Sequence, residues 1–308
     1  MEQIKLSIIS PVYKAATIVD ELVKRIGAAA DKITDDYEIV LVEDGGGDDS
    51  WERILENAKI TNKVKGIKLS RNFGQHYAIT AGLQFCSGDY IIIMDCDLQD
   101  NPNAIVDLVA KLKDGYDIVF TKRIAREHGL FKKITGFLYN KLISILADKR
   151  FDINGGSMVA FNKKVAQAFL QLNERDRLYV QLLKWVGFSQ THIFVQHDKR
   201  FEGKSSYTLY KMISLALQGL TSHSNKLLKL SIYFGFIISL LSFLIGFAII
   251  LLYFMNGFSP GWPSIFVAIS FAAGLILLSN GILGLYIGKA FEQVKNRPLY
   301  IVDKKINL

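Results

Sequence analysis

Two aspartates separated by a single residue, Asp95 and Asp97, are the strongest candidates for chemistry in this sequence. They directly follow the apolar run 90–94, which is typical of a buried strand. Carboxylates grouped at a strand end repel one another unless a cation or ligand donors compensate their charge. Hard divalent ions such as Mg²⁺ and Mn²⁺ take oxygen ligands and usually hold one or two protein carboxylates, with phosphates and water completing the shell. The pair therefore predicts a site for Mg²⁺ or Mn²⁺.

Two glycine-containing segments have the letters of nucleotide-binding loops but not their spacing. Residues 45–47 are all glycine, yet they match neither the dinucleotide-binding fingerprint nor the phosphate-binding loop. Residues 203–205 read Gly-Lys-Ser, without the strand and upstream glycine that a phosphate-binding loop needs. The acidic residues Glu43 and Asp44, just before the first glycine segment, are the better candidates for ligand contact.

The elements that must position these side chains alternate along the first half of the chain. β-rich runs occupy residues 6–10, 38–42, 64–69, 90–94 and 117–120. Helical periodicity marks residues 17–30, 49–59, 74–85 and 102–113. Such alternation predicts an α/β fold with a doubly wound, mainly parallel sheet, in which ligands bind beyond the carboxyl ends of the strands. One rim is expected to collect the residues that follow the first, second and fourth strands: Pro11, Tyr13, Glu43, Asp44, Asp95 and Asp97.

The second half of the chain contains two uncharged apolar runs, 230–254 and 265–286. Each is long enough to cross a hydrocarbon core of about 30 Å as a helix. Basic residues flank the pair on its outer sides, and the loop between the runs has none, so both chain ends are expected in the cytoplasm. Residues 205–229 combine apolar residues at helical spacing with lysines, which suits a helix in the headgroup zone of the lipid bilayer.

Composition agrees with a soluble half joined to a membrane half. Half of the residues are hydrophobic, which excludes a disordered chain, and the net charge of +8 favours anionic partners such as phosphorylated substrates or anionic lipid. Nucleic acid, also an anion, is not the partner we expect. Cys86 and Cys96 are too few for a disulfide framework and are read as reduced residues of a cytosolic half.

Four segments are therefore predicted. Residues 1–204 form a cytoplasmic sheet domain, 205–229 an interfacial amphipathic segment, 230–288 a two-helix membrane anchor, and 289–308 a cytoplasmic tail. No signal peptide is visible at the start, because the apolar run 6–10 is short and gives way to Pro11.

Several motifs, taken in order, resemble those of family 2 glycosyltransferases of the GT-A fold. They are Pro11-Val12-Tyr13, Glu43-Asp44-Gly45, Arg71-Asn72-Phe73-Gly74-Gln75, Asp95-x-Asp97-Leu98-Gln99-Asp100 and Lys122-Arg123. Residues 284–300 are similar to the tail of bacterial members with two membrane helices. More narrowly, the chain resembles the polyprenyl-phosphate glycosyltransferases, which include bactoprenol glucosyltransferases and dolichol-phosphate mannose synthases.

This resemblance implies an inverting transfer of a single sugar from a nucleotide sugar, most often a UDP-sugar, to a polyprenyl phosphate such as undecaprenyl phosphate. The product would be a lipid-linked sugar for cell-envelope glycans, made at the inner (plasma) membrane. A flippase partner is implied as well. Small residues along the second apolar run, Gly281, Gly284 and Gly288, favour self-association as a homo-oligomer.

The resemblance also implies three groups of site residues. The nucleotide sugar would contact Pro11, Tyr13, Glu43, Asp44, Gln75 and Asp95. The catalytic residues would be Asp95, Asp97 and Asp152, and the metal ligands Asp95, Asp97 and Gln99. The acceptor and donor phosphates would contact Arg123, Lys132, Lys133, Arg200 and Lys204.

The chain departs from the family pattern at four places. Lys14 and Ala15 stand where the family often has Asn-Glu, and Gly46 stands where a serine is usual. Around residues 154–157 an aspartate and an arginine of many members are missing, with Asp152 just upstream. Ser206 replaces a lysine, with Lys204 close by. These changes leave the sugar and the acceptor contacts open.

Two alternatives remain at this point. Residues 181–185 nearly spell the Gln-x-x-Arg-Trp motif of processive polysaccharide synthases, although two membrane helices are too few for a polymer channel. The departures from the family pattern also allow an inactive membrane protein that binds nucleotide sugars or lipid phosphates.

Overall fold

The computed structural model describes residues 4–123, 155–195, 226–256 and 261–308. The chain divides into two compact units. One, here called the sheet unit, comprises residues 1–130, 152–206 and 297–308. The other, here called the helical unit, comprises residues 131–151 and 207–296. Each is described by itself.

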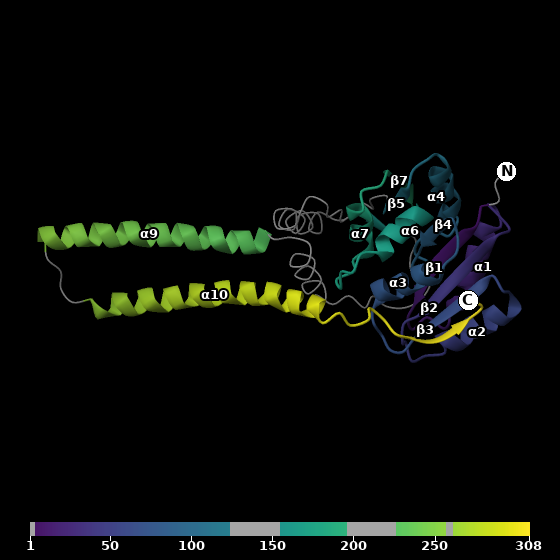
Figure 1. Ribbon diagram of the computed structural model, residues 1–308, viewed down its shortest axis with the longest axis horizontal. Helices are drawn as coiled ribbons and strands as arrows, with labels where there is room; N and C mark the ends of the chain where they lie inside the picture. Colours follow the sequence, from purple (N-terminus) through teal and green to yellow (C-terminus); the bar gives the residue numbers. More distant parts are fainter. Residues whose placement is uncertain (1–3, 124–154, 196–225, 257–260) are drawn as a thin grey trace, which may run out of the picture. The chain divides into compact units, whose positions relative to one another are not determined.

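The sheet unit begins with the predicted alternation of strands and helices (Figure 1). Its first elements are β1 (Leu6–Val12), α1 (Val19–Ala30), β2 (Tyr37–Glu43), α2 (Ser50–Ile60), β3 (Val64–Leu69), α3 (Gln75–Phe85), β4 (Tyr90–Ile93), α4 (Ala104–Lys113) and β5 (Ile118–Arg123). They are followed by β6 (Gly155–Asn162), α6 (Lys163–Leu170), α7 (Tyr179–Trp185), β7 (Gln190–Val195) and, after the helical unit, β8 (Val302–Ile306). The α/β class of the sequence prediction is confirmed.

The strands form one eight-stranded sheet in the order β7-β5-β6-β4-β1-β2-β3-β8. β1 pairs in parallel with β2 and β4, β2 with β3, and β5 with β7. β6 is antiparallel to both β4 and β5, and β8 is antiparallel to β3. Four of the seven pairings are parallel, as predicted, and the three antiparallel pairings make the sheet mixed. The alternation of strands and helices predicts crossover units, and antiparallel strands need no such helix.

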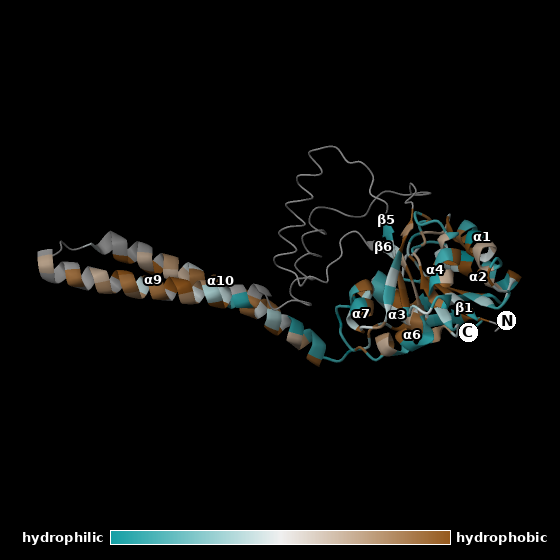
Figure 2. Cartoon of the chain, turned by 90° about the horizontal axis from the view of Figure 1, so that it is seen from above, coloured by the Kyte–Doolittle hydropathy of each residue, from teal (hydrophilic) through white to brown (hydrophobic). Residues whose placement is uncertain are grey.

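The core has two parts, one on each face of the sheet. Ile8 packs in the cluster with α1, α2 and α4, and its neighbour Ile9 packs in the cluster with α3, α6 and α7. The same alternation holds along β2 and β4, so both faces of these strands are buried. Figure 2 shows hydrophobic segments in the interior of the sheet unit. This double burial explains the continuous apolar runs in the sequence.

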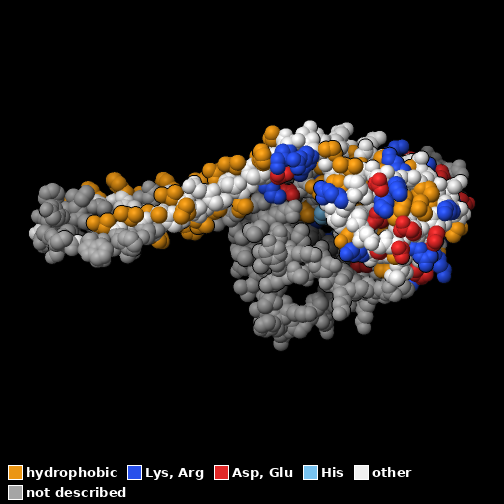
Figure 3. Space-filling model, turned by 90° about the horizontal axis from the view of Figure 1, so that it is seen from below, with side chains coloured by type: hydrophobic (Ala, Val, Ile, Leu, Met, Phe, Trp, Pro, Cys, Tyr) orange, Lys and Arg blue, Asp and Glu red, His pale blue; other side chains and the backbone are white. Residues whose placement is uncertain are grey.

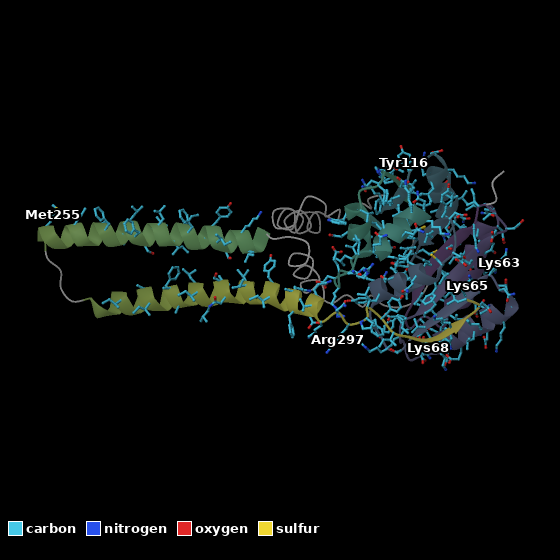
Figure 4. The ribbon with its side chains drawn as sticks, viewed as in Figure 1. Lys63, Lys65, Lys68, Tyr116, Met255 and Arg297 are labelled. Carbon is cyan, nitrogen blue, oxygen red and sulfur yellow. The ribbon has the colours of Figure 1, made fainter. Side chains whose placement is uncertain are left out.

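Residues 297–308 are part of the sheet unit rather than a separate tail. β8 pairs with β3, and the Ser70 N–H donates to the Ile301 carbonyl at 2.9 Å. The Asn307 amide donates to the carbonyls of Ala58 and Val64 at 2.8 and 3.0 Å. At the start of the segment, the carbonyl of Arg297 (labelled in Figure 4) accepts from Arg175 Nη2 at 2.7 Å. These bonds fix the segment along one edge of the sheet.

The helical unit contains α9 (Lys226–Asn256) and α10 (Trp262–Val294). Within the described residues, one stretch, Phe271–Val294, is both long and apolar enough to cross a membrane. The apolar stretch Ser231–Ile245 in α9 is shorter. Large apolar side chains are exposed on both helices, including Phe243 at 71% and Leu277 at 71%. Figure 3 shows hydrophobic side chains on the surface of this unit. One membrane helix is thus supported, and the second predicted span is not confirmed.

Candidate active site

The segment after β4 is tied to two neighbouring elements. Asp95 Oδ1 accepts a hydrogen bond from Gln75 Nε2, at the start of α3, at 2.6 Å. Asp97 Oδ1 accepts from the backbone N–H of Gln99 at 3.2 Å, which closes a local turn. Asp100 is buried and accepts from Ser157 Oγ in β6 at 2.5 Å. The predicted residues Gln75 and Asp95 are therefore brought together, and Gln99 supports Asp97 through its backbone.

β1 reaches the same segment through Cys96. The Tyr13 backbone N–H is one of the groups that lower the pKa of the Cys96 thiol, so the end of β1 lies near the residue between the two aspartates. Burial raises the pKa of the Cys96 thiol to about 12, which keeps it neutral. Pro11 lies inside β1 opposite Val42 and is buried, whereas the Tyr13 side chain is 47% exposed. Tyr13 is thus the more accessible of the two predicted nucleotide contacts.

Asp44 holds the loop between β3 and α3. Its two carboxylate oxygens accept from the backbone N–H groups of Phe73 at 2.8 Å and Gly74 at 2.9 Å. Burial raises the pKa of this carboxyl, and the two backbone hydrogen bonds lower it in part. The next residue, Gln75, is the one that bonds Asp95. Asp44 therefore orients the start of α3, where Gln75 bonds Asp95.

Gly45 allows these two loops to touch. A Cβ atom at this position would lie 2.3 Å from the backbone of Arg71 and Asn72, and the residue has a φ of +62°. No L side chain fits so close to backbone atoms, so the glycine is required by both space and conformation. The loop after β2 and the loop after β3 are consequently packed backbone to backbone.

Glu43, the last residue of β2, is 2% exposed, and only one of its two carboxylate oxygens is hydrogen-bonded to a described residue. Its Oε1 accepts from the Gly46 N–H at 2.5 Å. Its Oε2 is buried and has no hydrogen-bond partner among the described residues, as is also true of Asp48 Oδ1 in the following loop. Unpaired buried acceptors cost free energy, so they concentrate where a ligand or water completes them.

Two residues in the loops that follow β1 and β4 have strained backbone conformations. Lys14, directly after Tyr13, has a φ of +51°, and Leu98, directly after Asp97, has a φ of +55°. A left-handed backbone costs a bulky L residue roughly 1–2 kcal/mol. Residues held in such conformations are frequent at functional sites, where the surrounding structure fixes them.

The donor set fits a hard divalent cation. The residues that the structure describes contain no cluster of three or more His, Cys, Asp or Glu that would form a closed metal site. Mg²⁺ and Mn²⁺ do not need one, because substrate phosphates and water supply the remaining oxygens. Asp95 and Asp97 provide two carboxylates at a strand end, one of them oriented by Gln75. The chemistry of these ligands suits Mg²⁺ or Mn²⁺ better than a thiolate-binding metal.

Several predicted residues cannot be placed. Asp152, Lys132, Lys133, Arg200 and Lys204 lie outside the described residues. Arg123 is the last residue of β5 and pairs with Val195 of β7.

Two residues near the site were not singled out from the sequence. His76, next to Gln75, has a buried Nδ1 without a described partner, and its ring centroid lies 5.6 Å from that of Tyr179. Burial lowers the pKa of His76 to about 4. The buried Arg177 donates to Thr80 Oγ1 and to the carbonyls of Leu172 and Phe169. No local sequence signal distinguishes these residues from surface histidines and arginines.

Comparison with known proteins agrees with this architecture. Residues 7–170 match the family model described as Glycosyl transferase family 2. The chain belongs to glycosyltransferase family 2, and it is a glycosyltransferase.

Three relatives match over nearly their whole length. An uncharacterized glycosyltransferase, YkcC, of Bacillus subtilis is 36% identical over 99% of this chain and 95% of its own. An uncharacterized glycosyltransferase, sll0501, of Synechocystis sp. is 36% identical over 97% and 95%. The undecaprenyl-phosphate 4-deoxy-4-formamido-L-arabinose transferase of Klebsiella pneumoniae is 33% identical over 98% and 94%.

Solved structures match less closely. Glucosyl-3-phosphoglycerate synthase from Mycobacterium tuberculosis, in complex with Mn²⁺, UDP-glucose and phosphoglyceric acid, gives a TM-score of 0.49 at 15% identity. The match covers 71% of this chain and 78% of that chain.

Proposed function

We propose that this glycosyltransferase moves a single sugar from a nucleotide-diphosphate sugar to a membrane polyprenyl phosphate, with inversion at the anomeric carbon. The observation that carries the proposal is the rim after β4, where Gln75 holds Asp95 two residues before Asp97. The Klebsiella pneumoniae relative, which is named for transfer to undecaprenyl phosphate, matches 98% of this chain and supports the acceptor class.

The reaction suits a site without a strong base. A phosphate monoester has a second pKa near 6, so the acceptor is largely a dianion at neutral pH and is already a nucleophile. One of its oxygens attacks the anomeric carbon, and the bond from that carbon to the nucleotide diphosphate breaks with its electron pair leaving on the diphosphate. A single displacement of this kind inverts the anomeric carbon.

The main barrier is therefore electrostatic. Two anions must meet, and the leaving diphosphate gains negative charge as the bond breaks. A divalent cation held by Asp95 and Asp97 would supply the positive charge that stabilises this leaving group. Gln75 keeps one aspartate oriented for that task, and Asp44 keeps Gln75 in place. The chain thus contributes preorganised ligands.

The remaining roles follow the family resemblance. Pro11, Tyr13, Glu43 and Asp44 would border the nucleotide, and the exposed Tyr13 ring offers a face for the base. Basic side chains would hold the acceptor phosphate and offset its repulsion from the donor. The residues proposed for that role are Arg123, Lys132, Lys133, Arg200 and Lys204. Asp152 is proposed as a positioning residue or base.

The proposal places the enzyme at the plasma membrane, because a polyprenyl phosphate does not leave the bilayer. Residues 230–254 and 265–286 would anchor it as two spans with both ends in the cytoplasm, and residues 205–229 would lie in the headgroup zone. Tethering raises the effective concentration of the acceptor. The proposal also includes a flippase that moves the lipid-linked product across the bilayer. It further includes a homo-oligomeric state of the enzyme.

The direct test uses membranes that contain the full chain. They are incubated with undecaprenyl phosphate, Mg²⁺ or Mn²⁺, and each of several radiolabelled nucleotide sugars, and the lipid extract is separated by chromatography. One sugar per lipid phosphate, formed with one donor and lost on chelation, is the expected result. A long polysaccharide would instead support a processive synthase. Nucleotide binding without transfer to any lipid phosphate would support an inactive binding protein.

A further inference from the structure

The turn after β1 carries a lysine in an unusual backbone conformation. Lys14 follows Tyr13, has a φ of +51° and is exposed to solvent. Glycine or asparagine adopts this conformation with less strain than lysine does. A strained backbone at a rim of candidate ligand-binding residues is an observation from which a functional role can be inferred.

Neighbouring residues hold this turn in place. The Ala15 N–H donates to Ser50 Oγ at 3.0 Å, and the Ala16 N–H donates to Asp48 Oδ2 at 3.2 Å. Gly46 lies against the turn, because a Cβ atom at position 46 would be 2.9 Å from the backbone nitrogen of Lys14. The two departures from the family pattern noted in the sequence, Lys14 and Gly46, are thus in contact, and the glycine makes room for the lysine turn.

The Lys14 side chain lies over the ring of Tyr13, a residue proposed to border the nucleotide. Its Nζ is 5.5 Å from the centroid of the Tyr13 ring, which is 47% exposed. The Tyr13 backbone N–H lies near Cys96, the residue between Asp95 and Asp97. A cation placed over an exposed tyrosine ring is held weakly, so it is free to turn toward a stronger anionic partner.

The charges around this position favour such a partner. Asp44, Asp95 and Asp97 place negative charge on the rim that has to accept an anionic diphosphate. An ammonium group at this rim offsets part of that repulsion and offers three hydrogen-bond donors to phosphate oxygens.

We propose that Lys14 binds the diphosphate of the nucleotide-sugar donor, its ammonium group moving from the Tyr13 ring to a phosphate oxygen when the donor binds. The inference rests on the proposed function and adds a donor-binding residue to the site. Lys14 then determines how strongly the enzyme holds a nucleoside diphosphate, while the Tyr13 ring contributes to the nucleoside.

The test separates phosphate contact from base contact. Binding of UDP and of uridine, which lacks phosphates, is measured by calorimetry on the full-length protein in detergent, with and without Mg²⁺. Lys14→Met removes the charge and keeps the stem, Lys14→Arg keeps the charge, and Lys24→Met on α1 makes the same charge change at an exposed helix position. Lys14→Met should weaken UDP binding about tenfold and leave uridine binding within about twofold. Lys14→Arg and Lys24→Met should bind both as the unchanged protein does.

Three results would overturn the inference about Lys14, and a fourth would overturn the proposed function on which it rests. Unchanged UDP affinity in Lys14→Met would show that the ammonium does not contact the diphosphate. Equal losses for UDP and uridine would show that Lys14 acts on the Tyr13 ring or on the turn. If the unchanged protein bound neither UDP nor any other nucleoside diphosphate and transferred no sugar, the proposed function itself would fail. Equal transfer rates of the unchanged protein and Lys14→Met at a donor concentration below KM would overturn the inference about Lys14 alone.

Discussion

The two ends of β2 each carry a buried glutamate, and they differ in how those carboxylates are satisfied. Glu38, near the start of the strand, accepts from Ser7 Oγ, the Ser87 N–H and Ser87 Oγ at 2.6–2.8 Å. It also pairs with Lys65 (labelled in Figure 4) at 2.5 Å. Glu43, at the other end, has one bonded oxygen and one without a described partner. One end of the strand is a completed polar network, and the other is not.

This difference separates stability from function within a single strand. Burial alone would raise the pKa of Glu38, but the bonds from Lys65, Ser7 and Ser87 outweigh it and the pKa is lowered. At the opposite end the pKa of Asp44 is raised by burial, and two residues of that rim have left-handed backbones. A protein leaves polar groups unpaired and backbone strained where a ligand is to be bound. The comparison therefore supports the proposal that the active site lies at the carboxyl end of β2.

The largest expected effect is on the rim itself. Asp97→Ala should reduce sugar transfer by about a thousandfold or more, because it removes charge stabilisation of the leaving group. The melting temperature of the purified protein should change little. Transfer is measured by radiolabelled lipid product, with Asp107→Asn on the exposed side of α4 as the control. Retained turnover in Asp97→Ala would remove the metal assignment.

The comparison of the two glutamates can be broken directly. Glu38→Gln should destabilise the protein by about 3 kcal/mol, because it leaves Lys65 without its buried carboxylate. Glu43→Gln should change stability by less than about 1 kcal/mol, since Gly46 can still bond the amide oxygen. Thermal unfolding followed by intrinsic fluorescence measures both. Equal losses in the two variants would mean that the two ends of β2 do not differ in the way described.

The loss of stability at acid pH tests a second carboxylate that is fully hydrogen-bonded next to a strand. Asp117, just before β5, bonds Asn162, Ser189 and Lys164, and these partners outweigh burial and lower its pKa to about 2. A carboxyl with a lowered pKa stabilises the fold above its unfolded value, near 4, and this stability is lost as the pH falls toward 2. Asp117→Asn should flatten the fall in melting temperature between about pH 5 and pH 2. Asp114 forms an exposed surface pair with Lys111, so Asp114→Asn should leave the fall in melting temperature at acid pH unchanged.

The smallest expected effect concerns the far edge of the sheet. Asn307→Ala removes the two hydrogen bonds to the carbonyls of Ala58 and Val64 and should cost about 1 kcal/mol. Faster hydrogen exchange in residues 302–306 is the measurement. Asn307→Gly keeps the left-handed backbone at φ +59° without strain, so it isolates the loss of the side-chain bonds. Unchanged exchange in both variants would show that β8 is held by its strand pairing alone.

Elements with strong local patterns were predictable from the sequence. The five strands and four helices of the first half lie within a few residues of their predicted positions. The central strands have continuous apolar runs because both of their faces are buried, and the helices have apolar residues at helical spacing because one of their faces is buried. β6 was not predicted, since it begins with Gly155 and Gly156. β8 was not predicted either, because its sequence, Val-Asp-Lys-Lys-Ile, is mostly polar as suits an edge strand.

The sequence predicted which residues lie together in the candidate site. It did not predict the hydrogen bonds between them. Strand ends placed Tyr13, Asp44 and Asp95 on one rim because the topology requires it. The Gln75–Asp95 bond and the double acceptance by Asp44 depend on side-chain directions from different elements, which no local spacing encodes. The left-handed turn at Lys14 depends on space left by Gly46, a residue far away in the sequence.

The position of β8 in the chain has a consequence for biosynthesis. This strand is translated after both long apolar helices, so the ribosome has already passed the whole helical unit before the edge of β3 can be covered. Until then the backbone of β3 is an open template for pairing with other chains. Completion of the enzyme fold is thereby postponed until its hydrophobic helices have been made, and a nascent chain stalled among them would present that open edge to chaperones and proteases.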